Sequence, residues 1–216
     1  MDKHLLRYNK DIVYTAIDCE TYNLNLSFKF NVPWSIAILK FNGHKIISEK
    51  EIKIDWSKTF PNLKIGDEAA RITHFNYAEH QKVAIQPKEA FGMFWNDLKD
   101  CEFILAQNIL RFDIYLIKGY AEYMGVDWKF ITPKIIDTKA IAQGIKMGVP
   151  YTAQQGDFIE YLYRYSNIFK KGIKTSLGTL AKEYGIEVDE NKQHGAAYDL
   201  FLTKSVWDKQ KFQIEI

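Results

Sequence analysis

The stretch that decides the fold is DIVYTAIDCE, residues 11–20, an apolar run that ends in two carboxylates. Its β-branched and aromatic residues predict a buried strand over 11–18. Residues two apart on a strand point to the same side, so Asp18 and Glu20 project together from its end. Neighbouring carboxylates resist joint ionisation unless a cation lies between them. Divalent metals that prefer oxygen ligands are the obvious candidates, although a solvated strand end is the commoner meaning of such a pair.

Two further patches place acidic residues near predicted element ends. NILRFD, residues 108–113, follows the apolar run CEFILA at 101–106, where a strand would turn into a helix. HGAAYD, residues 194–199, opens a stretch whose apolar residues recur at helical spacing. His194 and Asp199 are five apart there, which is about 140° around a helix axis. A helix whose edge faced a site would present Asp199 inward, with His194 at the rim.

Composition narrows the class of protein. The 216 residues suit one domain, covering 1–216, and 47% apolar with 26% charged residues is ordinary for a globular protein. The net charge of +2 permits nucleic-acid binding without arguing for it. No apolar run is long enough to span a membrane and the first residues lack the core of a signal peptide, so we expect a cytoplasmic protein without membrane contact.

Cysteines and two of the histidines carry little functional signal. Cys19 and Cys101 lie in apolar runs without the partners of a zinc site, and we expect free thiols in a reducing compartment. His44 and His80 have no pattern around them and are predicted to be surface residues.

The order of elements predicts the fold class. Apolar runs predict strands near 11–18, 33–41, 45–54, 102–107 and 134–137, with a hairpin turn at Asn42-Gly43. Apolar periodicity predicts helices near 88–99, 112–124, 138–146, 176–184 and 195–209. Gly125 and Gly185 follow two of these helices, as C′ glycines do. Strands in a meander, followed by alternating strand and helix, predict an α/β fold with a mixed sheet and helices on both faces.

The three patches together resemble the Exo I, Exo II and Exo III motifs of the DEDDh (DnaQ-like) 3′–5′ exonucleases, in the ribonuclease H-like superfamily. DxET at 18–21 resembles the first, including its threonine. NxxRFD at 108–113 resembles the second in the spacing seen in bacterial exonuclease I, and HxAxxD at 194–199 resembles the third with the histidine of the "h" branch. PWSIAI at 33–38, IDT at 136–138 and SLGTL at 176–180 resemble supporting segments. The resemblance runs from about residue 12 to 207 and implies a ribonuclease H-like sheet of five strands, the second antiparallel to the rest.

The resemblance also implies a chemistry. Phosphodiester hydrolysis would use two divalent cations, Mg²⁺ (or Mn²⁺). Asp18, Glu20 and Asp199 would hold the first ion, with Asp18 bridging to a second that Asp113 supports. His194 would act as general base, because a histidine near its ordinary pKa suits proton abstraction at neutral pH. The alternative for His194 is a surface residue at a helix start.

Four other residues are candidates for substrate contact. Thr21 hydrogen-bonds the terminal 3′ hydroxyl or caps a turn. Asn108 and Arg111 hold their loop or touch the scissile strand. His74 has a counterpart in many relatives, where a similar segment flanks the nucleotide pocket, and a packing role is equally open.

One segment, about 147–174, is inserted relative to the pattern of the resembled family. From Lys146 to Lys174 the charge balance is +3, and six aromatic residues are interspersed. Basic side chains with aromatic faces suit single-stranded nucleic acid. The alternative is an amphipathic helix that buries Phe158, Leu162 and Tyr165, and the two can coexist.

The leading hypothesis is an exonuclease that releases nucleoside 5′-monophosphates from single-stranded 3′ ends, with DNA favoured over RNA. The first alternative is a 3′–5′ exoribonuclease resembling RNase T or oligoribonuclease, which recognition of the 2′ hydroxyl would decide. The second is a polymerase-associated proofreading or nucleic-acid-binding subunit, and a polymerase partner or a homodimer is open. The complete acidic set argues against a purely structural role, because burying four carboxylates without metal would cost several kcal/mol.

Overall fold

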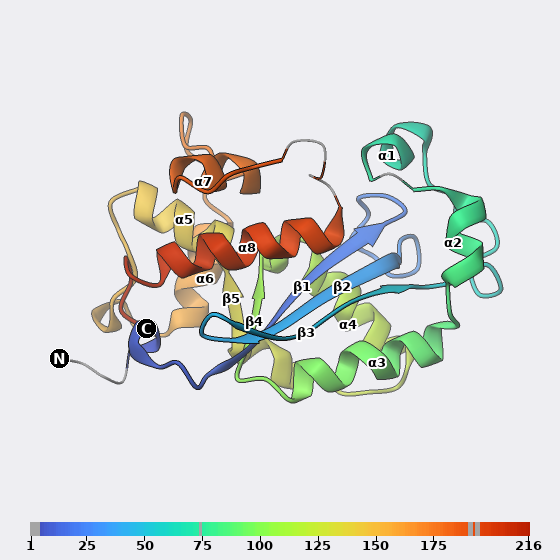
Figure 1. Ribbon diagram of the computed structural model, residues 1–216, viewed down its shortest axis with the longest axis horizontal. Helices are drawn as coiled ribbons and strands as arrows, with labels where there is room; N and C mark the ends of the chain where they lie inside the picture. The colour runs from blue at the N-terminus through green and yellow to red at the C-terminus, as the bar shows by residue number, and fades with distance from the viewer. Residues whose placement is uncertain (1–4, 74, 190–191, 193–194) are drawn as a thin grey trace.

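The computed structural model describes residues 5–73, 75–189, 192 and 195–216 (Figure 1). Its centre is a five-stranded sheet in the order β3-β2-β1-β4-β5. The strands are β1 (Val13–Thr21), β2 (Pro33–Asn42), β3 (Lys45–Lys53), β4 (Phe103–Ala106) and β5 (Ile135–Asp137). β2 is antiparallel to both of its neighbours, whereas β1, β4 and β5 run parallel. The predicted mixed sheet with an antiparallel second strand is confirmed.

The helices agree with the predicted periodicity where they are long. They are α1 (Asp67–Ile72), α2 (Tyr77–Val83), α3 (Pro87–Lys99), α4 (Asp113–Tyr123), α5 (Thr138–Lys146), α6 (Phe158–Ser166), α7 (Leu177–Glu183) and α8 (Ala196–Gln210). Short 3₁₀ turns are η1 (Leu6–Tyr8), η2 (Ile109–Arg111), η3 (Lys129–Lys134) and η4 (Ala153–Gln155). The sequence did not reveal α1 and α2, because α1 has no buried residue and α2 has only His80, so neither helix carries an apolar face.

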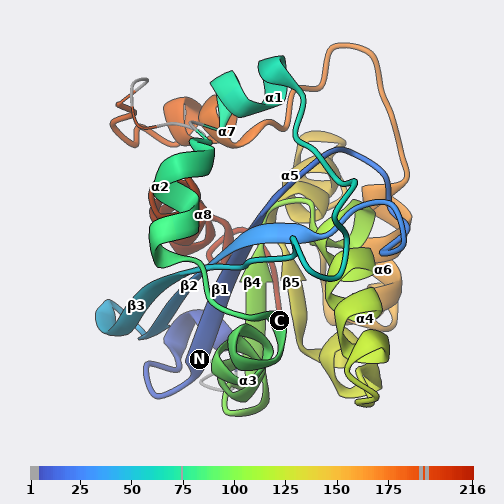
Figure 2. The ribbon, with the colours of Figure 1, turned by 90° about the vertical axis from the view of Figure 1, so that its right-hand side faces the viewer.

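Helices cover both faces of the sheet, as predicted. Tyr14 of β1 lies 6.1 Å from Trp207 of α8 between ring centroids. The hydroxyl of its neighbour Thr15 donates to the carbonyl oxygen of Asp97 in α3 at 3.1 Å. Alternate residues of β1 therefore face α8 and α3, and Figure 2 shows α8 on one side of the strands and α4 on the other. Asp18 and Glu20 follow Tyr14 by an even number of positions, so their side chains point to the same face of the sheet, the one that α8 covers.

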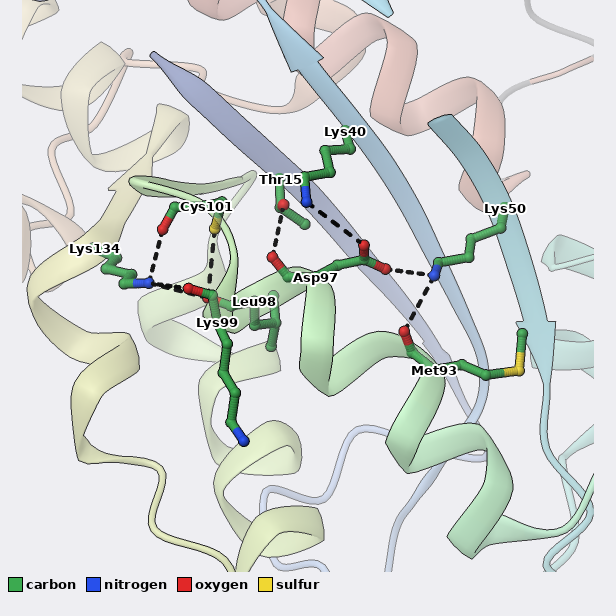
Figure 3. A network of polar contacts seen from close by, with 9 residues as sticks. All are labelled: Thr15, Lys40, Lys50, Met93, Asp97, Leu98, Lys99, Cys101 and Lys134. Carbon is green, nitrogen blue, oxygen red and sulfur yellow. Dashed lines mark hydrogen bonds and ion pairs between the residues drawn. The ribbon is translucent and has the colours of Figure 1, made fainter. Parts of the chain in front are cut away.

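The end of α3 is fastened to the sheet by the polar network of Figure 3. The Lys134 ammonium donates to three carbonyl oxygens at 2.7–3.3 Å, those of Leu98, Lys99 and Cys101. The last carbonyls of a helix have no partner inside it, and a cation satisfies them while opposing the helix dipole. Asp97 forms an ion pair with Lys50 of β3 at 2.5 Å. These contacts hold α3 against the face of the sheet opposite α8.

Burial follows the predicted pattern with one correction. Cys19 and Cys101 are both buried and both free, as expected. His44 is exposed, but the surface prediction for His80 was wrong, because its side chain is only 5% exposed. The ring packs 5.7 Å from Trp34, and its Nε2 lies 3.1 Å from the carbonyl oxygen of Ile54. The sequence did not predict α2, so it could not show that this helix packs over β2 and buries His80.

The segment 147–174, which the sequence predicted to be an insertion, contains α6, whose Tyr161, Leu162 and Tyr165 are buried. Phe158 is half-buried and packs against the core. The amphipathic alternative therefore describes the helix, while residues 169–172 of the loop after it are exposed. Among the described residues, no helix is long and apolar enough to cross a membrane.

Candidate functional site

Four predicted site carboxyls come from three elements that meet at the end of β1. Asp18 and Glu20 are half-buried on that strand, Asp113 is the buried first residue of α4, and Asp199 lies in the first turn of α8. Burial, together with the charges of Asp199 and Glu51, raises the pKa of Asp18 from 3.8 to about 7. The two strand carboxylates and the helix carboxylate of Asp199 therefore lie within electrostatic reach of one another.

Glu20 and Asp113 respond to the same cluster. Burial, followed by the charges of Asp18 and Asp199, raises the pKa of Glu20 from 4.5 to about 8, while Lys53 acts in the opposite direction. Burial and the charge of Asp18 raise the pKa of Asp113 well above its usual value. Electrostatic coupling thus links Asp18 to each of the other three carboxyl groups that the motifs singled out.

A fifth carboxylate, Glu51 of β3, belongs to the same surface and was missed by the sequence analysis. Asp18 pairs with Ala37 of β2, which pairs with Glu51, so both acids lie on the α8 face. In the next row Glu20 pairs with Ser35, which pairs with Lys53. The Ser35 hydroxyl donates to Glu51 Oε1 at 2.7 Å, and the Lys53 ammonium is ion-paired with the same oxygen.

Glu51 and Lys53 belong to no sequence motif, and only the pairing of the strands shows that they face the acidic cluster. Phe41 pairs with Ile46, but Lys40 pairs with Ser48, so a bulge shifts the register by one residue. Counting back from the hairpin turn without that bulge places Lys50 opposite Ala37. A one-residue shift moves every side chain of a strand to the other face. The bulge therefore decides that Glu51 and Lys53 face the acidic cluster.

The donor set fits hard divalent cations. All four predicted ligands are carboxylates, and carboxylate oxygens are the ligands that Mg²⁺ and Mn²⁺ prefer. Burial and the neighbouring carboxylates raise the pKa values of Asp18 and Glu20, and a cation bound between them would lower these pKa values. Among the described residues, no three acidic, histidine or cysteine side chains already stand in a ligand arrangement.

A cavity of about 590 Å³ opens beside Glu20, between the edge of the sheet, α2 and the start of α8. Trp34, Phe75 and Tyr198 contribute apolar wall, while Glu51 and Lys53 contribute charge. Trp34 and Phe75 meet edge to face with centroids 4.8 Å apart, which gives this wall a fixed shape. The cavity therefore combines apolar wall with charged groups beside Glu20.

The Asn108 turn positions Asp113. Asn108 has a left-handed backbone with φ +67°, the one such non-glycine residue in the described part of the chain. The buried carboxylate of Asp137 accepts from the backbone N–H groups of Asn108 and Leu110 at 3.0 and 3.1 Å. It also accepts from those of Lys139 and Ala140 at the start of α5. This carboxylate therefore holds together the turn after β4 and the helix after β5.

Two of the predicted substrate contacts are engaged within the chain. The Asn108 side-chain oxygen accepts from the Lys139 ammonium at 3.1 Å, and the Arg111 guanidinium donates to Ser166 O and Asn167 Oδ1 at 3.2 Å. Both residues thus hold the loop, which is one of the two roles expected of them. The Thr21 hydroxyl is buried and donates to the carbonyl oxygen of Asn23 at 2.7 Å, which is the turn-capping role.

Two predicted site residues, His74 and His194, lie outside the described residues. Their expected roles as nucleotide-pocket neighbour and general base stay predictions.

Comparison with known proteins identifies the fold. No family model matches the chain, and no curated protein matches it in sequence. Exonuclease I of E. coli, in complex with a dA16 oligonucleotide, aligns over 92% of this chain with 15% identity and a TM-score of 0.68. Exonuclease X, in complex with 5′-overhanging duplex DNA, aligns over 93% of this chain with 17% identity and a TM-score of 0.59. The chain has the fold of the DnaQ-like exonucleases.

The extent of these matches differs between the two proteins. The alignment covers 40% of exonuclease I but 92% of exonuclease X. A zinc-bound form of the E. coli exonuclease I complex with single-stranded DNA aligns over 94% of this chain and 41% of its own, with 15% identity and a TM-score of 0.70. The predicted ribonuclease H-like architecture and the structural resemblance to DnaQ-like exonucleases are confirmed.

Proposed function

We propose that the protein is a metal-dependent 3′–5′ exonuclease that hydrolyses phosphodiester bonds at single-stranded DNA ends and releases nucleoside 5′-monophosphates. The observation that carries the proposal is the acidic cluster, in which Asp18, Glu20 and Asp113 have raised pKa values because each is buried near other carboxylates. Buried neighbouring carboxylates do not stabilise the fold, but they provide the negative charge that binds a cation. The fold is that of exonucleases whose solved structures contain DNA.

Each residue of the cluster has an assigned role. Asp18, Glu20 and Asp199 would hold one divalent cation, and Asp18 and Asp113 a second. The cations, when bound, supply charge stabilisation for the transferring phosphoryl group and lower the pKa of water. His194 takes a proton from the attacking water, because imidazole titrates near neutral pH.

The cavity beside Glu20 is assigned to the terminal nucleotide. Trp34, Phe75 and Tyr198 offer the apolar surface that a nucleobase requires, and the cavity opens next to a cluster carboxylate. Thr73 lies on the same wall of the cavity.

The test is hydrolysis of end-labelled oligonucleotides. We expect labelled single-stranded DNA to shorten from its 3′ end with Mg²⁺ or Mn²⁺ and to stay intact in EDTA, with double-stranded DNA and RNA run in parallel. Asp18→Ala is expected to lose at least about 100-fold in kcat/KM, since several kcal/mol of charge stabilisation depend on it.

Asp11→Ala is the matched control, because Asp11 is an exposed acid just before the other end of β1. We expect it to retain wild-type activity. Undiminished hydrolysis in chelator, or a fully active Asp18→Ala protein, would overturn the proposal. Preferential hydrolysis of RNA would keep the reaction and reverse the substrate assignment.

A further inference from the structure

A second cavity, of about 570 Å³, lies between the Arg111 turn, the start of α5 and the loop at 167–176. Arg111, Lys139 and Lys170 line it, together with Asn108, Asn167 and Phe169, and we call it the cationic groove. None of the described residues that line it is acidic. Its three positive charges exceed the net charge of the whole chain, which is +2. This concentration of charge is a local feature of the fold.

Specific contacts hold the walls of the groove. The Arg111 guanidinium binds the beginning of the loop, at the carbonyl oxygen of Ser166 and the side chain of Asn167. The Gln107 side chain binds the other end, donating to the carbonyl oxygen of Thr175 at 2.9 Å. The loop is therefore tied at both ends to the segment that follows β4.

The middle of the loop is an ordered turn that presents Phe169 and Lys170. The N–H of Ile173 donates to the carbonyl oxygen of Lys170 at 3.1 Å, and Gly172 supplies the φ of +91° that this turn requires. Phe169 is 91% exposed, so its ring stabilises nothing in the core. An exposed aromatic ring beside several cations is the arrangement that single-stranded nucleic acid uses, with bases stacked and phosphates paired.

The groove adjoins the acidic cluster along the chain. Its wall continues from Asn108 to Phe112, and the next residue is Asp113. A polyanion that approaches buried carboxylates is repelled, so it needs an anchor elsewhere on the surface. When a 3′ end lies at the cluster, the remainder of the strand extends from the 5′ side of the reacting bond.

We propose that the cationic groove binds the sugar-phosphate backbone of the substrate strand on the 5′ side of the reacting bond, with Phe169 stacking on one base. This inference rests on the proposed exonuclease function for the direction of the strand. The recognition itself, phosphates by Arg111, Lys139 and Lys170, is independent of hydrolysis.

Binding without catalysis tests the groove directly. Fluorescence anisotropy with a labelled oligothymidylate of about 15 nucleotides in EDTA measures affinity when no reaction can occur. Phe169→Ala is expected to weaken binding about 5- to 150-fold, the range for one stacked base. Lys170→Gln is expected to lower the slope of log K against log salt by about 0.7, the value for one phosphate contact on a single strand.

The control variants remove the same kinds of side chain at positions outside the groove. Lys171→Gln removes the same charge one residue away, from an exposed side chain outside the groove lining, and is expected to leave the salt slope unchanged. Phe212→Ala removes another exposed ring, on the segment after α8, and is expected to leave affinity unchanged. Equal effects of Lys170→Gln and Lys171→Gln, or no effect of Phe169→Ala, would overturn the groove assignment.

Hydrolysis then distinguishes the two proposals. With Mg²⁺, the losses in kcat/KM for Phe169→Ala and Lys170→Gln are expected to be large on the long strand and to shrink on a dinucleotide, which is too short to reach the groove. Wild-type protein that binds through the groove but hydrolyses no nucleic acid would overturn the exonuclease proposal alone. Active protein whose groove variants lose equally on both substrates would overturn the groove alone.

Discussion

Replacing Asp137 by alanine tests the contact that positions the Asp113 turn. The Asp137 carboxylate is fully buried and accepts four backbone hydrogen bonds. Two of them, from Lys139 and Ala140, are the N-cap of α5, and loss of an N-cap costs about 1–2 kcal/mol. The other two, from Asn108 and Leu110, would leave buried N–H groups unsatisfied at about 1–3 kcal/mol each. We therefore expect Asp137→Ala to lower the free energy of unfolding by about 3–8 kcal/mol.

A matched variant isolates the loop bonds. Asp157 is the N-cap of α6 and accepts the equivalent two bonds, from Ile159 and Glu160, but it is exposed and contacts no second loop through them. Asp157→Ala is expected to cost about 1 kcal/mol, which corresponds to about 2–4 °C in Tm for a chain of this size. The difference between the two variants measures the bonds to Asn108 and Leu110.

Urea and thermal unfolding of both variants provide the measurement. Asp137→Ala is also expected to lose activity, because the turn that it releases leads directly into Asp113. If the two variants differ by less than about 1 kcal/mol, the bonds to the Asn108 turn contribute nothing and the reasoning is refuted.

Three further predictions concern the acidic cluster. Because the pKa values of Asp18 (about 7) and Glu20 (about 8) are raised above their unfolded values, ionisation costs folding free energy, so metal-free protein should lose stability in urea unfolding as pH rises from about 4 to about 8. Mg²⁺ should restore stability at the upper end in the wild type but not in Asp18→Asn, and a wild type indifferent to Mg²⁺ would contradict the metal assignment. Glu51→Gln should reduce this pH-dependent loss, while Glu49→Gln, farther from the cluster on the same strand, should not, and equal effects would remove Glu51 from the cluster. His194→Ala should lose about 10²–10⁴-fold in rate and the rise of activity with pH, with a smaller defect in alkaline buffer, whereas an unchanged profile at near-normal rate would make His194 a surface residue.

The sequence by itself determined the central strand and the side on which its two carboxylates project. An apolar, β-branched run specifies β1, and the two-residue period of a strand puts Asp18 and Glu20 on one side whatever surrounds them. The long helices followed from periodicity, because an amphipathic face is local information. The hairpin between the second and third strands also followed, although its two-residue loop is Gly43-His44, one residue later than the predicted Asn42-Gly43, with φ +49° at Gly43.

Only the tertiary structure decided which other side chains surround those carboxylates. His80 is buried because α2 closes over Trp34, a contact between segments about 45 residues apart that no local pattern reports. Glu51 and Lys53 face the cluster because one bulge in the β2–β3 pairing shifts the register, and without it Lys50 and Ile52 would stand there. A strand alternates with a period of two, so a shift of one residue exchanges its faces, and the pairing that sets this shift exists only in the folded sheet.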